Sequence, residues 1–247
     1  MLTGLTSVTF RQLTVDEIID LTAQAGLDGI EWGGDVHVPP ASPELAAQVA
    51  EKCRQKGLKV LSYGSYYRGS DPAEFAGVLE TAKALGAPVI RIWTGTTAPH
   101  ETSDEAFEIL AANIRAAAAM AAKEGIQLAF EFHRRTMTQT KEGALRLLEA
   151  VPDANVFTYW QPNPDVTFEE QLAEIDAVCP RLSHLHVFCW GPGNERFPLA
   201  DGVEKWKTYF AHAAKAPGER AAILEFVLND SPEQFLADAA TLKEMLQ

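Results

Sequence analysis

The sequence predicts a single (β/α)8 barrel, and three observations support this prediction. Short apolar runs alternate strictly with longer helical segments, which is typical of a parallel sheet. Eight units of about 31 residues each fit the usual length of a closed eight-stranded barrel. No glycine-rich dinucleotide turn follows the first apolar run, which disfavours an open doubly wound sheet. Because no composition break divides the chain, residues 1–247 are expected to form one TIM-barrel domain.

The expected strands are short and rich in β-branched and aromatic residues, as buried strands are. Glycine punctuates the first half of the chain, because a glycine just past a helix end adopts the left-handed conformation at little cost. Proline takes that place in the second half. The glycines are Gly26, Gly57, Gly86 and Gly125, and the prolines are Pro152, Pro180 and Pro217. The predicted strands cover residues 5–9, 28–32, 58–63, 88–93, 126–132, 155–160, 183–188 and 221–227.

The helix starts carry capping signals. Thr14 is followed three residues later by Glu17, the pattern of a capping box. Two of the expected helices span residues 104–123 and 168–178. Other cap residues, several of them followed by the proline favoured in a first helical turn, are Ser42, Asp71, Ser103, Thr167 and Ser231.

The charge balance narrows the functional classes. Lys and Arg number 21 against 34 Asp and Glu, which gives a net charge of −13. This balance argues against a protein that grips nucleic acid or an anionic membrane. No apolar run is long enough to span a bilayer, and the opening MLTGLTSVTFRQL does not resemble a signal peptide. Three widely spaced cysteines form neither a disulfide framework nor a zinc finger, so we expect a cytoplasmic protein.

Two carboxylates interrupt apolar strands close to the ends where a barrel places its active site. Glu131 lies between two phenylalanines, and Glu225 lies between Leu224 and Phe226. A carboxylate in such a place needs a cation, a proton or a hydrogen-bonded partner. Period-two alternation places His133 on the same strand face as Glu131. If these faces point inward, the two carboxylates meet at the barrel mouth.

The two strands between them add one amide and one imidazole. Gln161 ends one strand, and His186 shares a face with His184 in the next. Oxygen donors with one imidazole suit Mn²⁺, the expected ion, or Mg²⁺ and Co²⁺, and tolerate Zn²⁺. The alternative is that each carboxylate pairs with an arginine or a backbone amide, and His184 is expected to be a core or supporting residue. The expected metal ligands are Glu131, Gln161, His186 and Glu225.

Aromatic and cationic residues gather near the same strand ends. Aromatic rings there would stack on flat apolar faces, such as those of a sugar or an aromatic aglycone. Guanidinium groups match carboxylate or phosphate, although Arg134 or Arg135 is expected to be a solvated rim residue or a partner of a rim carboxylate. The expected pocket tryptophans are Trp32, Trp93, Trp160 and Trp190, with Phe10, Tyr63, Tyr66 and Tyr67 near them. The arginines are Arg11, Arg68, Arg91, Arg134, Arg135 and Arg196.

Five stretches of the sequence resemble those of a known group of proteins. They are LAFEFH, FTYWQPNPD, SHLHVFCW, AILEFV and RFPLADGVEKW, and the group is the xylose-isomerase-like barrel superfamily of sugar isomerases and epimerases. That family carries Glu, Asp, His and Glu on strands five to eight. The resemblance implies that Glu131 and Glu225 are both metal ligands and the general acid and base, with His133 and Arg196 contacting substrate. Gln161 replaces the usual Asp, which removes one negative ligand. Asp165 is the alternative ligand nearby.

These residues leave several functions open. The first is a divalent-metal-dependent isomerase or epimerase acting on a ketose through a metal-stabilised enediolate. The second is a metal-dependent lyase or dehydratase acting on a 3-keto sugar, keto-glycoside or inosose. The third is a non-catalytic sugar-binding or accessory barrel, and an abasic-site endonuclease is disfavoured by the acidic charge. A small carbohydrate is the expected partner, without nucleic acid or membrane, and a homo-oligomer remains open.

Overall fold

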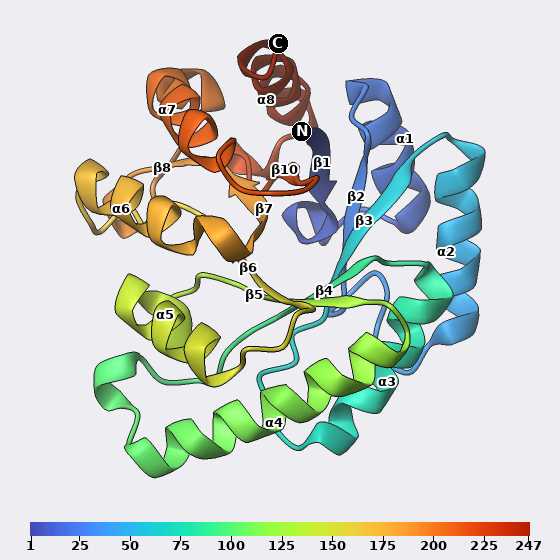
Figure 1. The fold of residues 1–247 in the computed structure, drawn as a ribbon. Helices are drawn as coiled ribbons and strands as arrows, with labels where there is room; N and C mark the ends of the chain where they lie inside the picture. Colours follow the sequence, from blue (N-terminus) through green and yellow to red (C-terminus); the bar gives the residue numbers. More distant parts are fainter.

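The computed structural model describes residues 1–247 as a closed barrel of eight parallel strands inside a ring of eight helices (Figure 1). This confirms the predicted fold class. The barrel strands are β1 (Leu2–Thr6), β2 (Gly29–Gly33), β3 (Lys59–Gly64), β4 (Val89–Ile92), β5 (Gln127–Phe130), β6 (Val156–Trp160), β7 (Leu182–Val187) and β10 (Ala221–Leu224). The helices are α1 (Val15–Ala25), α2 (Pro43–Gln55), α3 (Pro72–Leu85), α4 (Asp104–Lys123), α5 (Lys141–Ala150), α6 (Phe168–Val178), α7 (Val203–Ala213) and α8 (Pro232–Met245).

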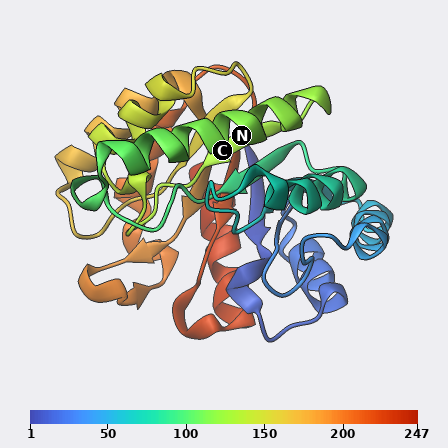
Figure 2. The same ribbon diagram turned by 90° about the horizontal axis from the view of Figure 1, so that it is seen from below.

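The barrel closes where the first strand meets the last. β1 pairs in parallel with β10, with Leu2 opposite Ala221 and Leu5 opposite Leu224. The other neighbours follow chain order around the ring, as connections by single helices require. Both termini therefore lie close together, as the two ribbon views show (Figures 1 and 2).

The predicted helix starts are borne out by side-chain caps. The Thr14 hydroxyl accepts a hydrogen bond from the Glu17 backbone N–H, and the Glu17 carboxylate accepts one from the Thr14 backbone N–H. Gly26 ends the same helix in the left-handed conformation, at φ 65°. Ser42 is the exception, because its hydroxyl donates to the Pro39 carbonyl oxygen instead of capping α2.

The strand boundaries differ from the prediction by up to three residues, as at the last strand, which was expected to reach residue 227 but ends at Leu224. The first strand was expected at residues 5–9, but it runs from Leu2 to Thr6, and a 3-10 turn occupies Ser7–Phe10. All four residues of that turn are buried, so its apolar pattern resembles that of a strand. β5 ends one residue before Glu131, yet the Glu131 backbone N–H still donates to the Ile92 carbonyl oxygen at 3.0 Å. The ladder therefore continues to hold Glu131 in register.

A small apolar cluster fills the barrel interior and supports the site above it. Its members are Leu61, Val89, Ala129, Tyr159, Ala221 and Ile223, all nearly inaccessible to solvent. Side chains two residues further along a strand point the same way. Arg91, Glu131 and Glu225 follow Val89, Ala129 and Ile223 by two residues. The strands therefore carry charged groups in the layer directly above an apolar one.

One short hairpin lies outside the barrel sheet. β8 (Cys189–Trp190) pairs antiparallel with β9 (Arg196–Phe197), after β7. Figure 2 shows this orange segment projecting from one end of the barrel. No helix of the structure has the length and apolar character needed to cross a membrane. The three cysteines form no disulfide.

Candidate active site

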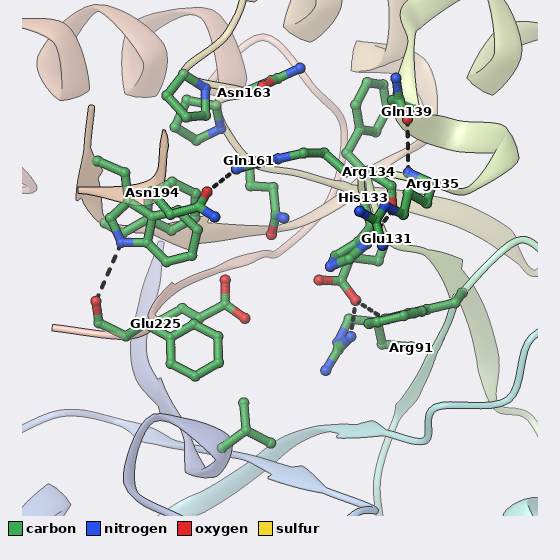
Figure 3. Close-up of a pocket in the computed structure, with 18 of the residues that line it drawn as sticks. Arg91, Glu131, His133, Arg134, Arg135, Gln139, Gln161, Asn163, Asn194 and Glu225 are labelled. Carbon is green, nitrogen blue, oxygen red and sulfur yellow. Dashed lines mark hydrogen bonds and ion pairs between the residues drawn. The ribbon is translucent and has the colours of Figure 1, made fainter. Parts of the chain in front are cut away.

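A cavity of about 560 Å³ opens at the carboxyl ends of the strands (Figure 3). Its floor contains Glu131 and Glu225, and its wall includes Gln161. The three side chains point toward one another from β5, β10 and β6. The volume falls in the range of small-molecule sites.

Three of the four expected metal ligands bring their donor atoms within 4.8 Å of one another: Glu131, His186 and Glu225. The Nδ1 atom of His186 lies 3.7 Å from a Glu131 carboxylate oxygen and 3.5 Å from one of Glu225. Gln161 joins the set, because its amide oxygen lies 2.8 Å from the same Nδ1. Around an octahedral ion with bonds of about 2.1 Å, neighbouring donors are about 3.0 Å apart and opposite ones about 4.2 Å. The donor set therefore fits a single small divalent ion.

The alternative ligand lies elsewhere. Asp165 is exposed on the loop after β6, and its carboxylate is 3.7 Å from the guanidinium of Arg134. It is absent from the cavity lining, whereas Gln161 faces the other donors. The expectation that Asp165 substitutes for Gln161 is therefore wrong in this structure.

His186 is held by a carboxylate that sequence analysis missed. Its Nε2 atom lies 3.1 Å from Oε1 of Glu31, a fully buried residue of β2. Ser62 and Thr6 donate hydroxyl hydrogen bonds to the same carboxylate at 2.7 and 3.1 Å. When neutral His186 donates from Nε2, the Nδ1 lone pair faces the cavity donors. The only signal in the sequence was a carboxylate inside the strand GIEWG.

Arg91 binds two of the buried carboxylates. Its Nε donates to Glu31 at 3.0 Å, and its Nη1 donates to Oε2 of Glu131. Trp93 Nε1 donates to that same Glu131 oxygen at 2.6 Å. The sequence grouped Arg91 with arginines that could bind a substrate anion. The structure corrects this, because both sides of its buried guanidinium are already occupied by Glu31 and Glu131.

Glu225 has no such partners. Its side chain makes no hydrogen bond, and its nearest cation is His186 at 3.5 Å. Burial, with a contribution from the nearby Glu131, raises the pKa of Glu225 to about 7. Burial would also raise the pKa of Glu31, but Arg91 and His186 together hold that pKa well below its ordinary value. Burial lowers the pKa of His186, but Glu225 and Glu31 outweigh it and raise that pKa.

The charges of this cluster also suit a cation. Three carboxylates, those of Glu31, Glu131 and Glu225, surround one permanent cation, Arg91. With His186 neutral and the carboxylates ionised, two negative charges remain uncompensated in a buried place. A buried charge of this kind needs protons, a partner or a metal ion. One divalent ion would balance it.

Two of the expected pocket tryptophans do line the cavity. The ring of Trp93 stacks on His133, with centroids 4.1 Å apart. Trp190 stacks on Phe188 at the same separation on the β8–β9 hairpin. His133 and Arg196, the expected substrate contacts, also line the cavity. These rings give the cavity two flat apolar surfaces.

The other two expected pocket tryptophans do not line the cavity, so the prediction was wrong for them. Trp32 and Trp160 are fully buried and lie outside the cavity. Trp160 packs on Tyr209 in the layer between barrel and helices, with centroids 5.0 Å apart. Period-two alternation explains both positions, because the inward residues are their neighbours, Glu31 and Gln161. Of the other aromatic residues, Tyr66 lines the cavity, whereas Phe10, Tyr63 and Tyr67 are core residues.

His184 and Arg68 also lie outside the cavity. His184 is buried, and its Nδ1 accepts a hydrogen bond from the Ala221 backbone N–H at 3.4 Å. This agrees with the expectation of a core or supporting residue. The Arg68 guanidinium stacks over the Trp93 ring, 4.0 Å from the ring centroid, and Arg68 lines a neighbouring groove.

The cavity wall contains unusual backbone. Seven residues other than glycine have positive φ, and four of them line this cavity. They are Tyr66, Arg135, Asn194 and Phe226, with φ of 56°, 58°, 67° and 48°. Large side chains adopt this conformation at a cost, and such strain concentrates at functional sites. This observation independently supports a functional role for the cavity.

Comparison with known proteins identifies the family. Residues 19–245 match the model of the xylose isomerase-like TIM barrel family. No curated protein matches the chain significantly. Among solved structures, a probable 3-DHS dehydratase from Bacillus anthracis is similar with a TM-score of 0.82 at 17% identity, covering 98% of this chain and 99% of that one.

Two epimerases have the same fold. A D-allulose 3-epimerase from Methylomonas sp. gives a TM-score of 0.74 at 15% identity, covering 99% of this chain and 98% of the other. The 3-keto-D-glucoside 4-epimerase of E. coli gives a TM-score of 0.73 at 17% identity, covering 100% and 99%. Similarity at this level of identity concerns the fold.

Proposed function

We propose that this chain, which belongs to the xylose isomerase-like TIM barrel family, is a divalent-metal-dependent enzyme that moves a proton at a carbon next to a carbonyl group of a carbohydrate. The observation that carries the proposal is the convergence of Glu131 and Glu225, on the floor of a sugar-sized cavity, with the buried His186. Isomerisation or epimerisation of a ketose is the first candidate reaction.

Glu131, Gln161, His186 and Glu225 are the proposed ligands of the ion. Mn²⁺ is the first choice for this set of oxygen donors with one imidazole, and Mg²⁺, Co²⁺ and Zn²⁺ are alternatives. When bound, the ion supplies positive charge that stabilises negative charge developing on the substrate oxygens. Glu31 supports the set by orienting His186.

The two glutamates on the floor have different roles in this proposal. Oε2 of Glu131 accepts hydrogen bonds from Arg91 and Trp93, which fix the orientation of the carboxylate. The oxygens of Glu225 accept none, so they are available to a C–H group of the substrate. Glu225 removes the proton while the electron pair of the C–H bond moves toward the carbonyl oxygen. In an isomerisation, Glu225 returns that proton to the adjacent carbon, while the hydroxyl proton of the first carbon passes to the former carbonyl oxygen and leaves a new carbonyl group behind.

The same asymmetry favours elimination as a second candidate. Epimerisation needs a proton donor on the opposite face of the carbon, and Glu131 is the nearest carboxyl group for that task. One of its two oxygens, Oε2, is already occupied by hydrogen bonds from Arg91 and Trp93. A lyase needs only the removal of the proton by one base, followed by loss of a hydroxyl or an alkoxyl group from the next carbon. A dehydratase or lyase acting on a 3-keto sugar, keto-glycoside or inosose is therefore the alternative.

The test is a screen of ketoses, inososes and 3-keto-glycosides with Mn²⁺-loaded protein in D₂O. Proton NMR would detect exchange at the carbon beside the carbonyl, and mass spectrometry would identify the product. An isomerase or epimerase leaves the mass unchanged apart from deuterium, whereas a lyase releases water or an alcohol. Mn²⁺ binding without exchange or product in any class would support the third interpretation, a non-catalytic sugar-binding barrel, and would contradict the proposal.

A further inference from the structure

The cationic side chains of the chain are distributed unevenly around the cavity. Five of the eleven arginines line it, and none of the ten lysines does. Arg91 lies at the floor, where it pairs with Glu31 and Glu131. The other four arginines lie around the rim. In a chain of net charge −13, this makes the cavity mouth a local basic region.

Two of the rim arginines are already neutralised by aspartates. Arg11 donates from Nε to Asp35 at 2.6 Å, and its Nη2 donates to the Tyr66 hydroxyl. Arg196 donates from Nη1 to Asp230 at 2.5 Å and to a backbone carbonyl oxygen. Their guanidinium groups therefore have an anionic partner within the protein.

Arg134 and Arg135 make no hydrogen bond to a carboxylate. Arg134 extends across the cavity mouth toward the loop of the β8–β9 hairpin, where it donates to the neutral amide oxygen of Asn194 (Figure 3). Its ion pair with Asp165 is loose, at 3.7 Å and without a hydrogen bond, and agrees with the expectation that Arg134 or Arg135 partners a rim carboxylate. The Arg135 side chain makes no hydrogen bond or ion pair and is exposed. These two guanidinium groups have donors free for a ligand.

The backbone that carries them is fixed. Arg135 has φ 58°, and its backbone N–H donates to the side-chain oxygen of Gln139 at 2.7 Å. The carbonyl oxygen of Arg134 lies 2.7 Å from Nδ1 of His133, whose ring stacks on Trp93. A strained conformation held by such contacts prearranges the segment over the cavity.

We propose that the substrate carries an anionic group, a carboxylate or a phosphate, and that Arg134 and Arg135 bind it at the outer end of the cavity. Guanidinium groups bind both kinds of oxyanion through paired, charge-assisted hydrogen bonds. The cavity of about 560 Å³ also has room for a six-carbon acid above the floor. This inference rests on the proposed function for the identity of the ligand as a carbohydrate, but its test does not require turnover.

The experiment measures binding of three ketoses that share a carbon skeleton: D-fructose, D-fructuronate and D-fructose 6-phosphate. Calorimetric titration of the Mn²⁺-loaded protein should show that at least one anionic ketose binds about tenfold or more tightly than D-fructose. The two anionic probes distinguish a carboxylate from a phosphate. Because the contact is ionic and close to solvent, the preference should shrink as the NaCl concentration rises.

Variants locate the anionic subsite. Arg134→Gln and Arg135→Gln should each weaken binding of the preferred anionic ketose by about tenfold or more, and leave D-fructose affinity within about twofold. Arg134→Lys should recover part of the affinity, because it keeps the charge but loses the paired geometry. Arg54→Gln, on the exposed face of α2 where Arg54 pairs with Glu51, is the matched control and should behave like the unaltered protein.

Two results would overturn the inference. One is equal binding of neutral and anionic ketoses, or no binding of any, in the unaltered protein. The other is an anion preference that survives in the Arg134→Gln/Arg135→Gln double variant with an unchanged melting temperature. Failure of the proposed function is separate, because loss of C–H exchange in the substrate screen would leave the measured anion preference intact.

Discussion

The ends of β5 and β10 carry the same residue in the same position but place it in opposite surroundings. Glu131 and Glu225 each stand two residues beyond an apolar residue of the interior cluster. Beside β5 lies β4, whose Arg91 and Trp93 both donate to Glu131. Beside β10 lies β1, and from the turn that follows it the Thr9 hydroxyl accepts a hydrogen bond from the Phe226 backbone N–H, with no donor to Glu225. The neighbouring strand therefore decides whether a carboxylate is held by hydrogen bonds or left without them.

The largest effect should come from the unpartnered carboxylate. Glu225→Gln removes the proposed proton acceptor, so exchange of the substrate C–H proton with D₂O should fall by about 10²- to 10⁴-fold. The fold should persist, because the substitution is isosteric. Glu80→Gln, on the exposed face of α3, is the matched control. If the Glu225→Gln variant exchanges the substrate C–H proton as fast as the control, Glu225 is not the proton acceptor, and the proposed difference in role between Glu225 and Glu131 is wrong.

The largest effect on stability should come from the partner of the fixed carboxylate. Arg91→Met leaves Glu31 and Glu131 buried without their shared cation. Removing one side of a buried ion pair costs about 3–5 kcal/mol of unfolding free energy. Urea denaturation monitored by tryptophan fluorescence would measure the loss. A double variant, Arg91→Met/Glu131→Gln, should recover part of it; no recovery would argue against the pairing.

Glu31 offers a smaller test of the same arrangement. Glu31→Gln removes the carboxylate that accepts from His186 Nε2 and should lower Mn²⁺ affinity by about 10- to 100-fold. Calorimetric titration with Mn²⁺ measures the change, with Glu80→Gln again as the control. Unchanged affinity would mean that Glu31 does not orient His186.

The smallest effect concerns a buried carboxylate outside the site. Burial raises the pKa of Glu174, whose partner is the Trp160 indole N–H at 3.1 Å, to about 7. The pKa is higher in the folded than in the unfolded chain, so the contribution of Glu174 to stability should be greatest at low pH and fall as pH rises from about 4.5 to 7. Glu174→Gln should therefore gain about 1–3 kcal/mol over the unaltered protein between pH 5 and pH 8. Denaturation curves at both values would show it, and a pH-independent difference would contradict it.

Local patterns were enough to predict most of the architecture. The capping box at Thr14 and the left-handed Gly26 act within one helix, so their sequence signals are short-ranged and reliable. The carboxyl ends of the strands were predicted well enough to bring Glu131 and Glu225 to one cavity. Trp32 and Trp160 lie on the outer face of their strands, because their neighbours Glu31 and Gln161 face inward.

The missing part of the site depends on contacts across the barrel. Glu31 and His186 are 155 residues apart in the chain, and Arg91 is 60 residues from Glu31. No local pattern carries such pairings, because they arise only when the sheet closes and the inward faces of distant strands meet. Rotamer choice then decides which carboxylate Arg91 binds, and that is a property of the packed structure.

The apolar cluster beneath the two glutamates fills the barrel axis, and the cavity that holds them opens at the other end. The cluster that includes Leu61, Val89 and Ile223 blocks passage along the barrel axis. Water, the proposed ion and the sugar therefore enter through the mouth that the arginines line. Under the proposed function, binding through this mouth would be ordered. The cation would bind before the sugar, and it would dissociate only after the sugar had left.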